Sequence, residues 1–285
     1  MADKPQDWSW AKPEPTRVPP EIDTTKPSVA RVYDYMLGGK DNFEVDRQMA
    51  AKVLELVPDA PNGGKVNRAF LRRAVTFLAA EVGLRQFIDF GSGLPTQGNV
   101  HEIAQAVDPE IRVVYVDNDP IVLAHGRALL ATNDVTTVIQ ADIRDPEAIL
   151  NHPEVRQFID FDRPVGLLML GILHHLPDSD DPAGLVARYL AAVPSGSHLV
   201  ISHFHDPGEA HPRASAQAKE SERIFNAHLG SGRWRTREEL MAFFAGTELL
   251  EPGLVPLAEW RPRPGDFTDV GSVYHTFVGA VARKP

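Results

Sequence analysis

The chain has no cysteine, which excludes disulfide bonds, thiolate metal sites and cysteine nucleophiles. It has no apolar run near the roughly 18 residues that cross a membrane, and its first residues lack the apolar stretch of a signal peptide. We therefore expect a cytoplasmic protein with no membrane partner. The net charge of −10 disfavours a broad surface for nucleic acid, which clustered lysine and arginine would provide. A small or neutral partner is the better expectation.

The length of 285 residues, of which 43% are hydrophobic and 24% charged, suits one large globular domain with a small accessory segment. Residues 1–27 are rich in proline, lysine and aspartate and predict a poorly ordered arm. Residues 28–83 predict an N-terminal helical segment. Its last helix covers residues 65–82, where apolar side chains share one face, and Gly83 stands where a helix normally stops.

The stretch RVYDYMLGGKDNFEVDR, at residues 31–47, is too polar for a core and too patterned for a tail. Apolar residues at helical spacing on either side of Gly38 and Gly39 predict two helices joined by a glycine turn. Glycine adopts positive φ without steric penalty, so this turn can bend sharply or lie against a ligand. An ordinary connection between two helices has the same turn chemistry and stays an alternative.

From residue 84 onward, short apolar runs alternate with helical segments. Five such pairs in succession predict a parallel sheet with helices on both faces, and right-handed crossovers make it doubly wound. The ligand site of such a sheet lies at the carboxyl ends of its strands. Two later segments predict two more strands, which close the sheet with an antiparallel pair. The seven strand segments are QFIDF, IRVVYVD, VTTVIQAD, PVGLLMLG, SHLVISHF, LEPGLVPLAEW and VYHTFVGAVA.

The first strand runs into the sequence DFGSGLPT, in which Asp89 precedes a turn containing Gly91 and Gly93. The backbone N–H groups of such a turn can face a ligand at the start of the next helix. The dinucleotide pattern GxGxxG would need a third glycine at position 96, where this chain has Thr96, and Pro95 stiffens the loop. A pyrophosphate therefore has little reason to prefer this turn.

The second and third strands also end in carboxylates. Asp117 follows the glycine turn at nearly the distance of a ribose-binding acid, and it can accept hydrogen bonds from both ribose hydroxyls. Asp119 directly precedes Pro120 and is the better candidate to cap the next helix. Asp142 can accept from the exocyclic amine of an adenine while Ile143 packs on its ring. An aspartate in an ordinary turn is the alternative for Asp142.

These motifs resemble those of a known enzyme class. DFGSG, YVDNDP, QADIRD and LMLGILHHLPD, in this order, look like the cofactor motifs of class I S-adenosylmethionine-dependent methyltransferases. ARVYDYMLGGKDNFEVDR resembles the signature of one group within them, the S-adenosyl methyltransferase family long filed as a domain of unknown function. The resemblance implies a Rossmann-like domain over residues 84–285, S-adenosyl-L-methionine as cofactor, and methyl transfer to a small molecule. The cofactor-binding residues it implies, with the strand-end carboxylates among them, are Asp89, Gly91, Ser92, Gly93, Asp117, Asn118, Asp142, Ile143 and Gly171. Pro95 departs from the pattern, since many class I enzymes have a third glycine there.

Within this picture, residues 31–42 are expected to fold over the cofactor site as a lid. Tyr33 and Tyr35 would be its aromatic walls, and the turn at Gly38 and Gly39 would approach the cofactor closely. An adenosylmethionine has no phosphate, so a glycine turn without a phosphate cradle suits it, and its cationic sulfonium suits nearby aromatic rings.

Two histidines are the candidate catalytic bases. His174 and His175 follow Gly171 at the end of the fourth strand, where an acceptor would lie beside the methyl group, and imidazole titrates near neutral pH. A structural histidine is the alternative. His203 and His205 share a strand face and could bind a divalent metal with neighbouring acids and histidines. Because strand-end histidines commonly bond to backbone or solvent, we expect no metal and place this pair in the acceptor pocket.

The last third of the chain adds supporting segments. A polar helical insertion near residues 207–232 is expected to shape the substrate site. Thr236 and Glu239 form the pattern of a capping box, and Trp260 is expected at the pocket rim. Two other functions stay open at this point: an NAD-dependent oxidoreductase, and a module that binds the cofactor without catalysis. The acceptor and the oligomeric state are not specified by the sequence.

Overall fold

The computed structural model describes residues 22–285, apart from residues 95–97, 130–133 and 269. Most of the predicted arm and Pro95 therefore lie outside the described residues. The centre of the molecule is a single mixed sheet with the strand order β3-β2-β1-β4-β5-β8-β6. Its strands are β1 Gln86–Phe90, β2 Arg112–Asp117, β3 Thr136–Gln140, β4 Gly166–Leu170, β5 His198–Phe204, β6 Glu248–Leu249, β7 Val255–Pro256 and β8 Phe277–Arg283.

The first five strands are parallel, as the alternating pattern predicts, and the strand order reverses between β1 and β4. β8 runs antiparallel to β5 along its whole length. The predicted seven strands become eight, because two short strands, β6 and β7, pair with different parts of β8. β7 and β8 form the expected antiparallel pair, and β6 is too short to show as an apolar run.

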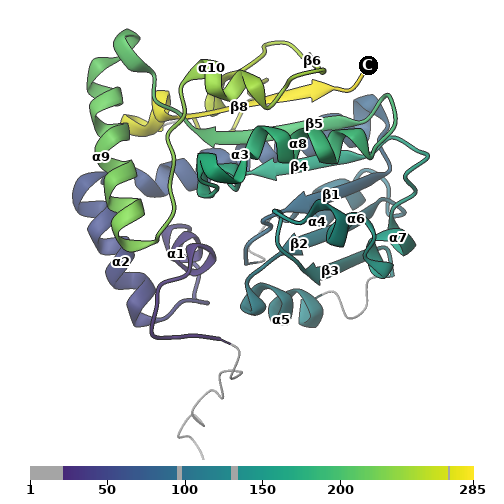
Figure 1. Ribbon diagram of the computed structural model, residues 1–285, viewed down its shortest axis with the longest axis horizontal. Helices are drawn as coiled ribbons and strands as arrows, with labels where there is room; N and C mark the ends of the chain where they lie inside the picture. The colour runs from purple at the N-terminus through teal and green to yellow at the C-terminus, as the bar shows by residue number, and fades with distance from the viewer. Residues whose placement is uncertain (1–21, 95–97, 130–133, 269) are drawn as a thin grey trace, which may run out of the picture.

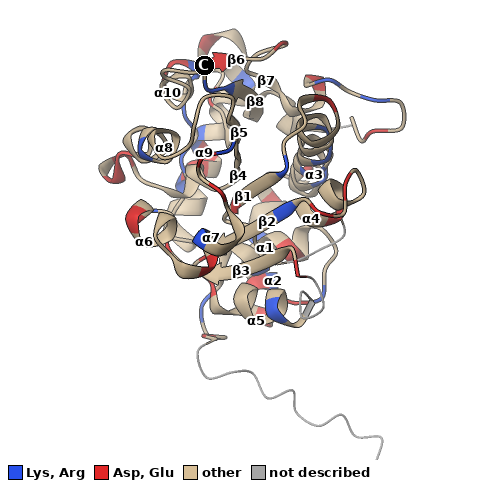
Figure 2. Ribbon diagram, turned by 90° about the vertical axis from the view of Figure 1, so that its right-hand side faces the viewer, with Lys and Arg blue, Asp and Glu red and all other residues tan. Residues whose placement is uncertain are grey.

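Helices cover both faces of the sheet (Figure 1; Figure 2). One apolar core joins the sheet to α6, α7, α8 and α10, and the other joins it to α3, α4 and α5. Strand residues alternate between the two cores, so that Phe87 and Ile88 lie on opposite faces. These helices are α3 Ala60–Phe77, α4 Val100–Gln105, α5 Pro120–Leu129, α6 Pro146–Leu150, α7 Pro153–Phe158, α8 Pro182–Ala191 and α10 Arg237–Ala242.

Three further helices lie beyond the carboxyl ends of the parallel strands (Figure 1). They are α1 Val29–Met36, α2 Glu44–Leu56 and α9 Pro212–His228. A separate apolar cluster, with Val32, Met49 and Val53 buried and Phe225 packed against them, holds the three together. Residues 29–56 and 212–228, which are far apart in the sequence, thus form one wall facing the carboxyl ends of the parallel strands.

The predicted helix-turn-helix at residues 31–47 is confirmed: α1 ends at Met36, Gly38 has φ +81°, and α2 begins at Glu44. The helix expected over residues 65–82 begins earlier, at Ala60, because Pro61 fits a first helical turn and the adjacent glycines after it do not break the helix. It continues into a π-helical turn, η2 Leu78–Val82, and stops at Gly83 with φ +83°.

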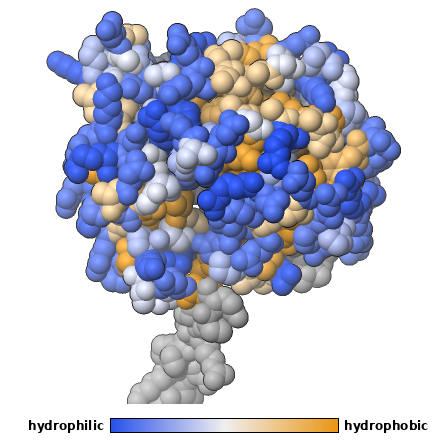
Figure 3. Space-filling model, viewed as in Figure 1, coloured by the Kyte–Doolittle hydropathy of each residue, from blue (hydrophilic) through white to orange (hydrophobic). Residues whose placement is uncertain are grey.

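Short turns complete the chain: η3 Leu173–His175, η4 Asp178–Asp180, η5 Gly208–Ala210, η6 Leu257–Glu259 and η7 Gly271–Thr276. The capping box at the start of α10 is confirmed, since the Glu239 carboxylate accepts from the Thr236 N–H at 2.7 Å. None of the helices in the described ranges is both long and apolar enough to span a bilayer. In the view of Figure 3, hydrophilic residues predominate and apolar ones show between them in smaller groups.

Candidate active site

A cavity of about 690 Å³ lies between the carboxyl ends of the parallel strands and the wall formed by α1, α2 and α9. This volume is within the range of about 300–1,000 Å³ that is usual for small-ligand pockets. All the predicted cofactor and catalytic residues except Gly38 line it, and they come from four different strand ends and from α1. The fold therefore brings together groups that are as far apart in the chain as Tyr33 and His175, which are 142 positions apart.

The turn after β1 is tied to the end of β2. Gly91 and Gly93 have φ of +66° and +64°, a region that side chains make unfavourable. A Cβ at Gly91 would lie 2.6 Å from the Ile172 side chain, so only glycine fits this approach. The N–H of Gly93 donates to Oδ2 of Asp117 at 2.8 Å. This contact fixes the loop beside the second strand end, and Ser92 lines the cavity between the two glycines.

Two buried carboxylates lie at the base of this turn. Asp89 is 6% exposed, and burial, with the charge of Asp117 nearby, raises its pKa to about 7, although Arg68 acts in the opposite direction. Burial also raises the pKa of Asp117, while N–H groups of Asp119 and Gly93 that donate to its oxygens partly offset this. A carboxylate has about four lone-pair sites, so Asp117 retains acceptor capacity for hydroxyl groups.

The third strand end is arranged differently from the prediction for it. Asp142, Ile143 and Asn118 all line the cavity. The Asp142 carboxylate, however, pairs with Arg144, whose Nη2 lies 2.5 Å from Oδ2 and whose Nε lies 3.0 Å from Oδ1. The hydrogen bonds from Arg144 lower the pKa of Asp142. An adenine amine at this position would share an acceptor that is already engaged.

The helix α1 presents only one of its two tyrosines to the cavity. Tyr33 lines it, whereas Tyr35, two positions later on the helix, is 36% exposed and is outside the described lining. The predicted close approach of Gly38 and Gly39 to a ligand is also not found among the described lining residues. A Cβ at Gly39 would instead collide with the Asp34 carboxylate.

Asp34 explains this glycine turn in structural terms. Its Oδ2 accepts from the N–H of Asp41 at 3.0 Å and from Nδ2 of Asn42 at 2.9 Å, so one buried carboxylate organises the whole loop. At the other end of α1, the Ser28 hydroxyl donates to Asp119 at 2.6 Å. Asp119 also accepts from the N–H of Ile121 at 3.0 Å, which confirms its predicted capping position.

A polar chain that the sequence did not reveal crosses the cavity wall. The Ser202 hydroxyl at the end of β5 donates to Oδ1 of Asn67 at 2.7 Å, Nδ2 of Asn67 donates to the Tyr33 hydroxyl at 3.3 Å, and that hydroxyl donates to the Gly64 carbonyl at 3.3 Å. Asn67 is 5% exposed and lines the cavity from α3. A polar residue on the apolar face of a predicted helix was the only available signal for it.

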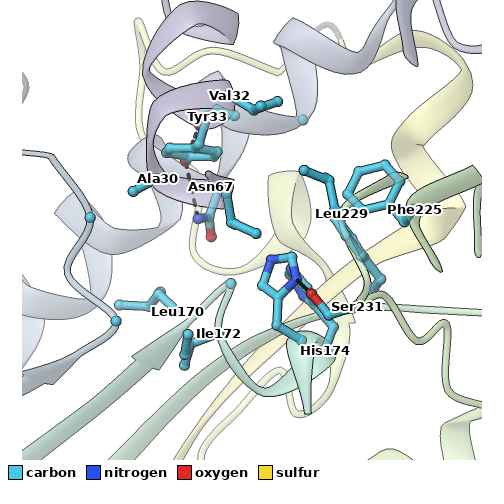
Figure 4. Close-up of a pocket in the computed structure, with 18 of the residues that line it drawn as sticks. Ala30, Val32, Tyr33, Asn67, Leu170, Ile172, His174, Phe225, Leu229 and Ser231 are labelled. Atoms are coloured by element: carbon cyan, nitrogen blue, oxygen red, sulfur yellow. Dashed lines mark hydrogen bonds between the residues drawn. The ribbon is translucent and has the colours of Figure 1, made fainter. Parts of the chain in front are cut away.

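The two candidate bases lie together on η3, which follows the end of β4. Figure 4 shows His174 in the cavity, between Ile172 and Ser231. The His174 ring is 3% exposed, and within the described residues no group hydrogen-bonds to its Nδ1. Burial, with neighbouring His175, His203 and Arg235, holds the pKa of His174 well below its ordinary value. Nδ1 of His175 lies 3.2 Å from the Ser231 hydroxyl, and burial lowers the pKa of His175 to about 4. Both imidazoles are therefore neutral at pH 7.

Aromatic rings surround His174. Its ring stacks on Phe204, with centroids 3.6 Å apart, and Phe204 stacks on Trp234 at 4.2 Å. Phe225 and Phe277 meet Phe204 edge-on at 5.8 and 5.1 Å. All four of these rings line the cavity. A Cβ placed at Gly171 would lie 3.4 Å from Nδ2 of Asn67 and 3.8 Å from Cε1 of His174, so the aromatic wall and the polar chain meet at this glycine.

The second histidine pair does not line the cavity within the described part of the chain, contrary to expectation. Nε2 of His203 lies 2.9 Å from Nη1 of Arg235, a donor, so Nε2 accepts and Nδ1 donates to the Phe204 carbonyl at 2.6 Å. Burial lowers the pKa of His203 to about 3. Nδ1 of His205 lies 2.8 Å from the His275 carbonyl. No group of metal-binding side chains occurs among the residues searched, which are the described ones.

Arg235 instead holds the histidine turn in place. Its guanidinium donates to the carbonyls of Leu173 and Leu176, at 3.1 and 2.9 Å, and to Asp178 at 2.7 Å. The N–H of Arg233 donates to the His174 carbonyl at 2.8 Å. These contacts fix the backbone on both sides of the two histidines.

Two further expectations concern the last third of the chain. The insertion near residues 207–232 lies over the site as predicted, since Gln217, Ser221 and Phe225 of α9 line the cavity. The expectation for Trp260 is wrong: its ring is fully buried against Phe70 and Phe77, away from the cavity.

Comparisons with known proteins cover almost the whole chain. The model of the S-adenosyl methyltransferase family matches residues 15–285. A DUF574 family protein from Streptomyces avermitilis is 41% identical, with 92% of this chain and 99% of that chain covered and a TM-score of 0.86. A candidate methyltransferase from Thermobifida fusca is 45% identical, with 95% and 99% covered and a TM-score of 0.87. An O-methyltransferase family 2 protein from Planctomyces limnophilus, at 17% identity, 89% and 65% coverage and a TM-score of 0.50, shares the fold. A search of curated proteins found no match.

Proposed function

The chain belongs to the S-adenosyl methyltransferase family and is a class I S-adenosylmethionine-dependent methyltransferase, and we propose that it methylates a small molecule bound in the cavity beside His174. The observation that carries this proposal is the continuity of the cavity. The cavity extends from the carboxylates at the strand ends, past the glycine turns, to the aromatic rings around His174. The NAD-dependent alternative lacks its third glycine and is not what the family match indicates.

The residues at the strand ends fit the cofactor. Asp89 is buried with a pKa of about 7, and the cationic amino group of the cofactor would stabilise its ionised form. Asp117 would accept from the ribose hydroxyls, and Ile143 would pack on the adenine. The cofactor would lie along a surface with short side chains, which is lined by Gly91, Ser92, Gly93, Asn118 and Gly171. When bound, S-adenosylmethionine supplies a methyl group on a sulfonium that is ready for displacement.

The acceptor side depends on positioning. The rings around His174 exclude water, and Arg235 and Arg233 hold the turn that carries it, so an acceptor can be kept in line with the methyl group. His174 is the better candidate base of the pair, because its ring stacks on Phe204 within the aromatic wall of the cavity, whereas Nδ1 of His175 lies beside the Ser231 hydroxyl.

We also propose that residues 31–42 act as a lid within an N-terminal helical segment of residues 28–83. Tyr33 faces the cavity, and the segment meets the loops after β1 and β2 through the hydrogen bond from Ser28 to Asp119 and the packing of Ala30 and Phe43 in a small apolar cluster. Such contacts are of the kind that can break and re-form as a ligand enters.

Calorimetry with S-adenosylhomocysteine tests the cofactor site. Asp117→Ala is expected to weaken its binding by roughly 2 kcal/mol or more, because two charge-assisted hydrogen bonds to ribose are lost. Asp162→Ala, which removes an exposed carboxylate remote from the cavity, is the control and should bind as the wild type does. Equal affinity in the wild type and Asp117→Ala would reject the assignment of this strand end.

A further inference from the structure

The charges that line the cavity are distributed unevenly. Among the described lining residues, the charged ones are Arg68, Asp89, Asp117, Asp119, Asp142 and Arg144. All but Arg68 lie at the ends of β1, β2 and β3 or just after them. The described lining residues from α1, α2, α9 and the segments 229–234 and 273–277 include no lysine, arginine, aspartate or glutamate. The half of the cavity that these elements line, on the other side of Gly171 from the strand-end carboxylates, therefore offers no oppositely charged side chain to an ionic ligand.

Rings form one continuous wall of the same half, and its other described lining residues are aliphatic or uncharged polar, among them Gln217, Ser221, Ser231 and Thr276. His174, Phe204 and Trp234 form a continuous stack, with Phe225 and Phe277 packed edge-on against it. A charged group taken into such surroundings loses its hydration without a compensating charge, which disfavours its binding. A flat apolar molecule gains from the same surroundings through burial and ring contacts.

His174 is the polar group that lies within the stack of rings. Nδ1 of His174, in a ring that is 3% exposed, has no hydrogen-bond partner among the described residues, and the ring lines the cavity. A neutral imidazole has one nitrogen that accepts and one that donates. The low pKa of His174 keeps it in this neutral form at pH 7. Nδ1 itself is closed off from the cavity, so a ligand hydroxyl would meet the ring at its other nitrogen, Nε2, for which the described residues show no hydrogen bond.

We propose that the methyl acceptor is an uncharged, mainly apolar ring compound whose hydroxyl group hydrogen-bonds to the His174 imidazole, so that the reaction is an O-methylation. The inference rests on the proposed function. In the transfer step the acceptor oxygen bonds to the methyl carbon, the carbon–sulfur bond breaks with its electron pair staying on sulfur, and the hydroxyl proton passes to the His174 imidazole. The products are the methyl ether and neutral S-adenosylhomocysteine, and the imidazolium then returns its proton to solvent.

Three fluorescent ring compounds of similar size test the proposal, titrated against the full chain saturated with S-adenosylhomocysteine. They are 2-naphthol, 2-methylnaphthalene and 2-naphthoate, which carry a hydroxyl, a methyl and a carboxylate at the same position. We expect 2-naphthol to bind about tenfold more tightly than 2-methylnaphthalene, because one buried hydrogen bond is added. We expect 2-naphthoate to bind the most weakly of the three. This comparison needs no variant, so a folding defect cannot obscure it. Binding of 2-naphthoate equal to or tighter than that of 2-naphthol, or no binding of 2-naphthol, overturns the proposal.

A variant pair then assigns the hydroxyl contact. His174→Phe keeps a flat ring on Phe204 but removes the nitrogen, and it should abolish the advantage of 2-naphthol over 2-methylnaphthalene. The control is His198→Phe, since His198 is also a buried histidine whose Nδ1 has no partner in the described residues, but it lies at the start of β5, outside the cavity lining. The control should keep the tenfold advantage. A retained advantage in His174→Phe overturns the proposal. Calorimetry with S-adenosylhomocysteine on the same preparations separates the two levels: if it binds while the ring preferences fail, only this inference falls.

Discussion

The buried carboxyl of Asp89 makes a quantitative prediction about stability and pH. Burial raises its pKa from an ordinary 3.8 to about 7. The folded chain therefore holds this proton more tightly than the unfolded chain, so the stabilisation is present at low pH and is lost as the pH rises from about 4 to about 7. A difference of about three pH units corresponds to about 4 kcal/mol over the whole range, and about 2.5 kcal/mol of this falls between pH 5 and pH 8.

Asp89→Asn is the perturbation that isolates this effect, because asparagine has nearly the same shape and does not titrate. Relative to the wild type, the variant should gain about 2.5 kcal/mol of stability between pH 5 and pH 8, a relative rise in Tm of roughly 5 °C or more. Thermal unfolding followed by circular dichroism at the two pH values measures it. Burial lowers the pKa of His175 to about 4 and of His203 to about 3, which costs both proteins stability below about pH 6.5 and cancels in the comparison.

The same variant connects stability with binding. A neutral side chain cannot pair with the cationic amino group of the cofactor, so Asp89→Asn should be more stable at pH 8 and should also bind S-adenosylhomocysteine more weakly. Asp162→Asn, which changes an exposed carboxylate, should alter neither quantity. If the difference in Tm between Asp89→Asn and the wild type were the same at pH 5 and pH 8, the reasoning about this buried carboxyl would be refuted.

Two further results are expected. Asp142→Ala should weaken S-adenosylhomocysteine binding in calorimetry less than Asp117→Ala does, because Arg144 already engages both oxygens of Asp142, and an equal loss would contradict this. Saturation with S-adenosylhomocysteine should raise hydrogen-exchange protection over residues 31–42 more than over α8, residues 182–191, which packs on the sheet outside the described cavity lining. Unchanged protection of residues 31–42 in saturated protein would exclude the lid.

α8 is the reference for this experiment because α9 itself lines the cavity, through Gln217, Ser221 and Phe225. A helix that is polar on most of its surface can still present one narrow face to a ligand, and the period of its apolar residues does not show which element it will meet.

The strand ends could be predicted from the sequence because local patterns and general topology suffice there. A buried parallel strand is a continuous apolar run, and a polar residue that follows it lies at the edge of the sheet where ligands bind. Asp89, Asp117, Asp142 and Gly171 all line the cavity for this reason. The family resemblance of the motifs is confirmed by the family match over residues 15–285.

The acceptor side was decided only by tertiary structure, because its side chains come from segments that no local rule brings together. Tyr33 rather than Tyr35 faces the cavity because of the way α1 packs on α2 and α9, and Asn67 joins it from α3. The His174 ring lines the cavity, and its Nδ1 has no hydrogen-bond partner in the described structure. His203, which the sequence made an equally good candidate, is instead hydrogen-bonded through Nε2 to Arg235. The sequence determined the sheet and its carboxylates through short-range periodicity, whereas the orientation of each helix over the sheet depends on contacts between residues far apart in the chain.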